Sequence, residues 1–177
     1  MAESQEKILL DEQAMAGCLE KLGREILTNL PEGVPLAVVG IRSRGEVLAQ
    51  RLVDILHHLG AERIDAGTLD ITLYRDDLAE RGPQAVLRKT DIPFDIDGRF
   101  IILMDDVLHT GRSVRAALDA LVDLGRPRAI RLAVLVERPG RELPIQADYV
   151  GVRVVQEDLP VAVRLTESDG IDEVRVG

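Results

Sequence analysis

The stretch "IILMDDVLHTGRS", residues 101–113, decides how this chain folds. Four apolar residues, typical of a strand covered on both faces, lead to Asp105 and Asp106 and then to a turn that contains Gly111. Apolar residues at three-to-four spacing then predict a helix over about 112–124. A buried strand that passes through a short turn into a helix indicates an α/β sheet, whose ligand sites lie beyond the carboxyl ends of the strands.

The same alternation continues on both sides of this stretch. We predict helices over about 11–29 and 44–60, strands over 36–41, 66–74, 129–136 and 147–155, and short strands and turns over 156–177. Strands that alternate with amphipathic helices favour a mostly parallel sheet with right-handed crossovers. The connection from Arg75 to Pro93 has no sustained period, and its length of about 19 residues is typical of a functional lid.

Length and composition limit the class of protein. The 177 residues suit a single domain, and 46% hydrophobic with 30% charged residues is a globular composition. No apolar run approaches the roughly 18 residues that cross a bilayer, and the N-terminus lacks a secretory pattern, so we expect a cytoplasmic protein without a membrane span. The net charge of −9 argues against general affinity for nucleic acid, although it leaves room for a local basic patch. Cys18, the single cysteine, is expected to be a buried structural thiol.

The turn after the two aspartates has the features of a phosphate site. Backbone N–H groups at the start of a helix, with the Thr110 and Ser113 hydroxyls beside them, favour an anion. Asp105 and Asp106 would repel that anion unless they bind sugar hydroxyls, a divalent cation or both. A phosphorylated ribose with Mg²⁺ satisfies every group. The alternative is that the two carboxylates only cap the helix or face solvent, and the buried strand before them argues against it.

A second candidate loop, "RSRG" at residues 42–45, also lies between a strand and a helix. Gly45 permits an unusual backbone, and Arg42 or Arg44 could face an anion, although a solvated basic turn fits equally well. Two neighbouring anion loops would suit a substrate with two phosphate groups. The GxxxxGK[ST] and GxGxxG phosphate motifs are both absent from the sequence.

At this point the residues resemble a known family. "IILMDDVLHTGRS" resembles the PRPP-binding motif of type I phosphoribosyltransferases, where PRPP is 5-phosphoribosyl 1-pyrophosphate. The stretches "VGIRSRG", "LDITLYRDDL", "DIP", "MDDVLHTGRSVRAALDALVDLGRPRAIRLAVLV" and "RELPIQADYVG" are similar to the PyrR family of bifunctional pyrimidine operon regulators and uracil phosphoribosyltransferases. The similarity extends from about Ile8 to Gly151. It implies one phosphoribosyltransferase domain over 1–177, with a mostly parallel sheet flanked by helices and a small hood from about 1–12 and 137–177.

The resemblance also implies an activity and its residues. Mg²⁺-PRPP and uracil would give UMP and pyrophosphate, with Mg²⁺ held mainly through PRPP, so no protein residue is assigned as a metal ligand. Asp105 and Asp106 would be the catalytic pair that binds the ribose hydroxyls. The 5′-phosphate site would comprise Val107, Leu108, His109, Thr110, Gly111, Arg112 and Ser113, the pyrophosphate loop Ser43, Arg44 and Gly45, and the start of the lid Tyr74, Arg75, Asp76 and Asp77. Arg138 falls at the hood position near the base.

Further partners follow from the resemblance. The family binds leader mRNA of the pyrimidine operon when UMP is bound, which attenuates transcription, and it forms homo-oligomers, either dimers or higher assemblies. Ala16, Gly17 and Gln146 stand where the family has arginines, so we expect RNA contacts to be reduced. His109 stands in place of a tyrosine, which leaves a transferase for another base open as an alternative. A nucleotide sensor with little turnover is the other alternative.

Overall fold

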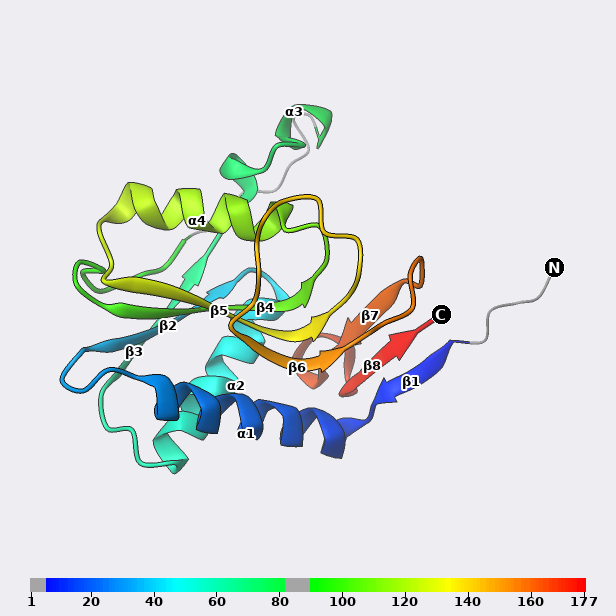
Figure 1. Cartoon of the computed structure of the whole chain (residues 1–177), viewed down its shortest axis with the longest axis horizontal. Coiled ribbons are helices and arrows are strands. Elements are labelled where there is room, and N and C mark those ends of the chain that lie inside the picture. The colour runs from blue at the N-terminus through cyan, green and yellow to red at the C-terminus, as the bar shows by residue number, and fades with distance from the viewer. Residues whose placement is uncertain (1–5, 82–89) are drawn as a thin grey trace.

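A five-stranded parallel sheet forms the centre of the computed structural model, which describes residues 6–81 and 90–177. The strand order is β3-β2-β4-β5-β6, and β4, which carries the aspartate pair, occupies the middle (Figure 1). The strands are β2 (Leu36–Ile41), β3 (Ile64–Leu69), β4 (Phe100–Leu108), β5 (Ala129–Glu137) and β6 (Tyr149–Arg153). All four pairings are parallel, as the alternation of strands and helices predicts.

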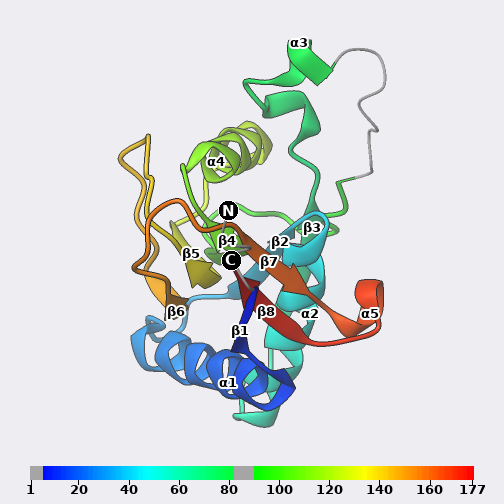
Figure 2. The ribbon, with the colours of Figure 1, turned by 90° about the vertical axis from the view of Figure 1, so that its right-hand side faces the viewer.

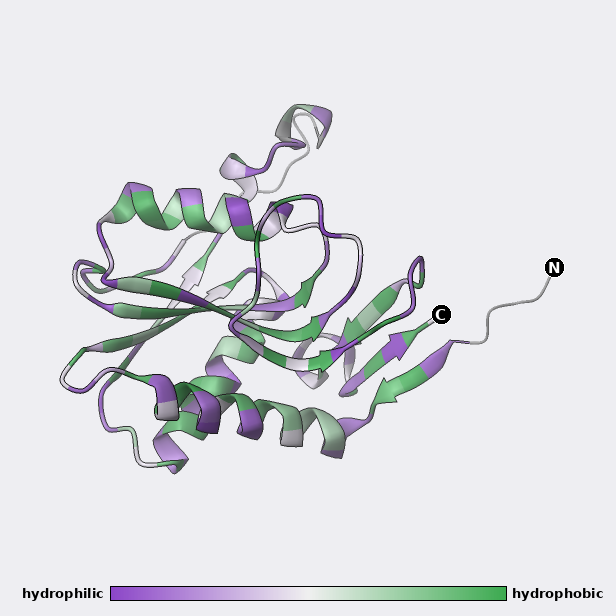
Figure 3. Ribbon diagram, in the orientation of Figure 1, coloured by the Kyte–Doolittle hydropathy of each residue, from purple (hydrophilic) through white to green (hydrophobic). Residues whose placement is uncertain are grey.

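Helices cover both faces of this sheet. α1 (Glu12–Asn29) and α2 (Arg44–His58) lie on one face and α4 (Arg112–Leu124) lies on the other (Figure 2). Successive residues of β4 point to opposite faces, so Ile102 packs with α1 and α2, whereas Leu103 packs with α4. The strands of the central sheet are accordingly mostly hydrophobic with a few hydrophilic positions, while the helices carry hydrophilic residues throughout (Figure 3). The three predicted helices are confirmed, with Asp11 capping α1 by accepting a hydrogen bond from the Ala14 N–H at 2.8 Å.

A small antiparallel sheet joins the two ends of the chain. It contains β1 (Lys7–Leu10), β8 (Glu173–Val176) and β7 (Val161–Arg164), with the short helix α5 (Thr166–Asp169) between β7 and β8. β7 also contacts β4, which places this hood sheet beside the central strand. Residues 149–153 fall inside the range expected for the hood, but they form β6 of the central sheet. The hood sheet therefore consists of β1, β7 and β8.

Several predicted strand ends are wrong, β6 among them at 149–153 rather than 147–155, and two of them lie at the candidate site. β3 spans 64–69 rather than 66–74, because the Asp70 carboxylate accepts hydrogen bonds from the Thr72 N–H at 2.9 Å and the Thr72 hydroxyl at 2.6 Å, which turns the chain into the 3-10 helix η1 (Thr72–Tyr74). β4 continues through both aspartates to Leu108, because β5 stays paired with it that far.

The segment expected to form a lid is only partly described. η1 is followed by α3 (Leu78–Arg81), and residues 82–89 of the predicted lid lie outside the described residues. The chain then returns to the edge of β3, where Thr68 and Asp91 form an antiparallel bridge. None of the helices within 6–81 and 90–177 is long and apolar enough to span a membrane.

Candidate active site

A cavity of about 300 Å³ lies at the carboxyl ends of β2, β3 and β4. Its lining comes from segments far apart in the sequence, namely Ile41 to Arg44, Asp70 to Thr72, Arg75, Asp105 to Val107, and Ser113. The structure therefore brings the two predicted anion loops to one cavity, as expected for the carboxyl edge of a parallel sheet. Asp70, Ile71 and Thr72 were not predicted as site residues, although their position directly after a strand is a signal that could have found them.

The two aspartates hold each other and the backbone in place. Asp105 is 8% exposed, and one of its oxygens accepts a hydrogen bond from the Asp106 N–H at 2.9 Å. Asp106 in turn accepts one from the Val107 N–H at 2.8 Å. Burial, together with the neighbouring Asp106, raises the pKa of Asp105 well above its usual range. A ligand that supplies hydroxyl donors or a cation would favour the ionised form of Asp105.

The turn beside the aspartates presents the start of α4 to the cavity. Gly111 has a φ of +92°, a left-handed conformation that favours glycine, and it leaves the first turn of α4 without a side-chain cap. The Thr110 hydroxyl accepts a hydrogen bond from the Arg112 N–H at 3.3 Å, and Ser113 lines the cavity. The N-terminus of a 13-residue helix therefore faces a polar cavity, an arrangement that favours a phosphate group.

The 42–45 loop sits directly on the sheet because two glycines allow it. A Cβ atom on Gly45 would lie 2.6 Å from the Met104 carbonyl oxygen, and a Cβ atom on Gly40 would lie 2.4 Å from the Gly45 carbonyl oxygen. The peptide bond between Arg42 and Ser43 is cis. Gly40 was not among the predicted residues, although a glycine inside an apolar strand does signal close approach of another backbone.

The arginines of this loop are held by the protein. Arg42 donates to the Glu46 carboxylate at 2.9 Å and to the Thr68 hydroxyl at 3.0 Å. Arg44 lines the cavity, yet its guanidinium donates to the Val163 carbonyl at 2.7 Å and contacts the Asp169 carboxylate at 3.2 Å. Arg44 therefore connects the predicted pyrophosphate loop to the hood sheet.

The predicted start of the lid lies against α4. The Tyr74 hydroxyl donates to the Asp123 carboxylate at 2.7 Å, and Arg112 contacts Asp76 at 2.6 Å. Arg75 lines the cavity and pairs with Asp77 at 2.8 Å. Of these four predicted lid residues, Arg75 is the one that reaches the cavity lining.

The other predicted residues lie outside the cavity lining. Leu108 is 1% exposed and packs in the core with α4. His109 lies against the loop between β5 and β6, since a Cβ atom on Gly140 would be 2.7 Å from its Nε2 atom. Burial followed by the charge of Arg138 lowers the pKa of His109. The Nε atom of Arg138 is buried without a partner among the described residues. Cys18 is partly buried on α1, and burial raises the pKa of its thiol, as expected for a structural cysteine.

Comparison with known sequences gives the family. The family described as "Phosphoribosyl transferase domain" matches residues 5–169. A protein named "Bifunctional protein PyrR" from Roseiflexus sp. (strain RS-1) is 51% identical over 166 residues, which cover 93% of this chain and 91% of that protein. The chain belongs to the PyrR family. A PyrR protein from Chloroflexus aurantiacus is also 51% identical, over 96% of this chain and 93% of its own length.

Solved structures agree with this fold. A hypoxanthine-guanine phosphoribosyltransferase from Bacillus anthracis matches with a TM-score of 0.74 at 18% identity, covering 97% of this chain and 98% of its own. A hypoxanthine phosphoribosyltransferase from Trypanosoma cruzi matches with a TM-score of 0.75 at 18% identity, covering 96% and 94%. The predicted type I phosphoribosyltransferase fold is confirmed, and the chain is a PyrR-type phosphoribosyltransferase.

The cavity fits Mg²⁺ only together with a ligand. Carboxylate oxygens such as those of Asp105 and Asp106 are suitable for Mg²⁺, which usually binds one or two protein carboxylates plus substrate phosphates. In the described part of the chain, no group of three or more His, Cys, Asp or Glu side chains is placed to hold a metal. The residues present therefore fit an ion that arrives with a phosphorylated substrate.

Proposed function

We propose that this protein transfers the phosphoribosyl group of Mg²⁺-PRPP to uracil, which yields UMP and pyrophosphate. One observation carries the proposal: an aspartate pair, of which Asp105 is buried, lies in one cavity between the N-terminus of α4 and the 42–45 loop. This order of groups suits a sugar with a phosphate on each side. Membership in the PyrR family supports uracil as the base.

Each part of the proposed substrate has a place. Asp105 and Asp106 bind the ribose hydroxyls as acceptors, and the turn 107–113 binds the 5′-phosphate through backbone N–H groups and hydroxyls. The loop 43–45 binds the pyrophosphate. Arg138, with a buried Nε atom that lacks a partner among the described residues, faces the uracil.

The proposed reaction breaks the bond between ribose C1 and the pyrophosphate oxygen and forms a bond from C1 to a uracil nitrogen, whose proton passes to the departing pyrophosphate. Positive charge develops on the ribose as pyrophosphate leaves. The Asp105 and Asp106 carboxyl oxygens lie beside that charge and stabilise it, while the 43–45 loop holds the leaving group. Bound Mg²⁺ supplies charge neutralisation of the pyrophosphate. Closure of the segment that begins at Tyr74 excludes water, so the base rather than water reaches C1.

An assay of labelled uracil with PRPP tests this function. We expect UMP to form with Mg²⁺ present and to stop forming when EDTA removes the ion. Cytosine, hypoxanthine and guanine, added in excess, should leave the rate nearly unchanged. Preferred use of one of these bases would contradict uracil as substrate, and PRPP or UMP binding without any turnover would indicate a nucleotide sensor instead.

The word "bifunctional" in the relatives' name favours a second function. We propose that this protein also binds the leader mRNA of a pyrimidine operon when UMP is bound, and that this contact is weak. On α1, Arg24 pairs with Glu20 at 2.7 Å and Lys21 with Glu25 at 3.7 Å. Basic side chains already paired with carboxylates offer less charge to phosphates.

A homo-oligomer in the cytoplasm, a dimer or a higher assembly, completes the proposal. Leu73 and Leu124 are 64% and 52% exposed and line one largely apolar groove between η1 and α4. Exposed apolar surface of this kind favours an interface. Light scattering at micromolar concentration should give at least twice the 19.5 kDa chain mass, and a monomer would contradict this part.

A further inference from the structure

One side chain joins the pyrophosphate loop to the hood sheet. Arg44 is the first residue of α2, and its Nε donates to the Val163 carbonyl of β7 at 2.7 Å. Its Nη2 lies 3.2 Å from each oxygen of the Asp169 carboxylate at the end of α5. The guanidinium therefore contacts both a strand and a helix of a segment more than a hundred residues away.

Asp169 is held in place by hydrogen bonds within its own turn, independently of Arg44. Its carboxylate accepts a hydrogen bond from the Leu165 N–H at 2.9 Å, and its own N–H donates to the Leu165 carbonyl at 2.6 Å. Leu165 is fully buried, so this turn rests on the core. The hydrogen bond from Leu165 and the charge of Arg44 both lower the pKa of Asp169, which keeps the carboxylate ionised at neutral pH.

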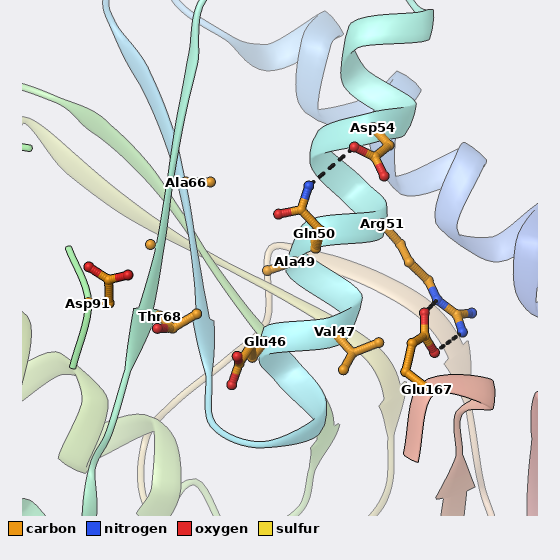
Figure 4. A pocket seen from close by; sticks show the side chains of 11 residues that line it. Glu46, Val47, Ala49, Gln50, Arg51, Asp54, Ala66, Thr68, Asp91 and Glu167 are labelled. Carbon is orange, nitrogen blue, oxygen red and sulfur yellow. Dashed lines mark hydrogen bonds and ion pairs between the residues drawn. The ribbon is translucent and has the colours of Figure 1, made fainter. Parts of the chain in front are cut away.

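The hood does not depend on this contact for its attachment to α2. Arg51, two turns further along α2, donates to Glu167 at 2.9 Å and to Asp172 at 2.8 Å. Figure 4 shows Arg51 and Glu167 meeting at a pocket of about 440 Å³ beside α2. The Arg51 contacts already attach α5 to α2. The Asp169–Arg44 contact is therefore not needed for this attachment and can position the 43–45 loop.

The residues beside Arg44 are those that face the substrate. Ser43 lines the cavity, and Gly45 packs against the Met104 carbonyl and Asp105. An Arg44 side chain held by Val163 and Asp169 of the hood fixes the backbone between these two neighbours. We propose that Asp169 is a positioning residue that holds the 43–45 loop, through Arg44, in the shape that receives the pyrophosphate end of PRPP. This inference rests on the function proposed above.

The test compares two neutral variants of the same helix. In Asp169→Asn we expect the KM for PRPP and the inhibition constant of pyrophosphate to rise about 5- to 10-fold, the size of one weakened charged hydrogen bond. The kcat and the inhibition constant of UMP should change less than about twofold, because the 5′-phosphate site is untouched. Glu167→Gln removes a comparable arginine contact from α5 and should leave the pyrophosphate constant unchanged. A general loosening of the hood would instead raise both inhibition constants in both variants.

Several results would overturn the inference. An unchanged or lower KM for PRPP in Asp169→Asn would mean that Asp169 has no influence on the loop or competes with the substrate for Arg44. An equal rise of the KM for PRPP and of the pyrophosphate inhibition constant in Glu167→Gln would mean that loss of any contact between the hood and α2 disturbs the loop. If Asp169→Asn does not fold, Asp169→Glu should show a smaller rise in the same direction. If the wild-type protein forms no UMP, the proposed function fails, and the Kd for pyrophosphate, measured by calorimetry in the same variants, still decides the role of Asp169.

Discussion

Asp105 is a buried carboxylate whose ionisation is unfavourable in the folded protein, since burial and Asp106 raise its pKa. The stability that protonated Asp105 provides is present at low pH and is lost as the pH rises through the raised pKa. Asp105→Asn keeps an acceptor for the Asp106 N–H without the charge. We expect this variant to be about 1 kcal/mol more stable than wild type at pH 8, with a smaller difference at pH 4, and at least 10-fold less active. Urea unfolding of both proteins at both pH values checks this prediction. A variant less stable than wild type at pH 8 would contradict it.

Gly45 provides the sharpest steric prediction. A Cβ atom 2.6 Å from the Met104 carbonyl oxygen forces backbone to move, so Gly45→Ala should lose about 1–3 kcal/mol of stability and most of the turnover. Gly17→Ala on α1 is the matched control, because nothing lies within 4 Å of a Cβ atom there. That variant should gain about 0.5–1 kcal/mol from helix propensity. Thermal melts and the UMP assay compare the two, and equal stability of both variants would contradict the close packing.

Single residues also show what the sequence could and could not reveal. Asp105, Asp106 and Gly111 were predicted to lie together because a buried strand, a turn and a helix follow one another locally. The partner of Arg44 could not be predicted, since Asp169 is 125 positions away and meets it only through the pairing of the chain ends. Leu108 looked like part of the turn, but the pairing with β5 keeps it in the strand and its side chain in the core.

Among the elements, the turn that follows α5 carries the clearest pH dependence. The hydrogen bond from Arg51 lowers the pKa of Asp172 to about 2. A lowered pKa adds stability that is present above the ordinary value near 4 and is lost as the pH falls toward 2. Asp172→Asn should therefore lower stability by about 1 kcal/mol at pH 7, allowing for solvent screening, and by almost nothing at pH 2. Urea unfolding at both values checks this, and a difference that grows in acid would contradict it.

The elements themselves were largely predictable, and their ends were less so. Apolar periodicity placed α1, α2 and α4 and the buried strands. The end of β3 depends on the Asp70 side chain, which turns the chain at Thr72, whereas the end of β4 depends on pairing with a distant strand. A side chain that turns its own backbone leaves only a weak pattern in the local sequence. Pairing with a strand that is distant in the sequence leaves no local pattern.

For the whole molecule, the net charge of −9 limits the proposed RNA contact. If about two phosphates are neutralised, RNA affinity should fall only about 7-fold between 50 and 200 mM salt. Glu20→Gln frees Arg24 from its pair and should raise the affinity and steepen the salt dependence. Filter binding with UMP present measures both. A fall of 1,000-fold or more in the unmodified protein would contradict a weak RNA face.

The central claim is that the aspartate pair and the two anion loops form one PRPP site. The most direct test is the rate of UMP formation from uracil and PRPP with Mg²⁺ in Asp106→Asn, beside Asp119→Asn, whose carboxylate pairs with Arg115 on the exposed side of α4. We predict that Asp106→Asn folds normally and loses at least 100-fold in kcat/KM, about 2.7 kcal/mol of transition-state stabilisation, while Asp119→Asn keeps the wild-type rate. Wild-type turnover in a folded Asp106→Asn protein would contradict the site.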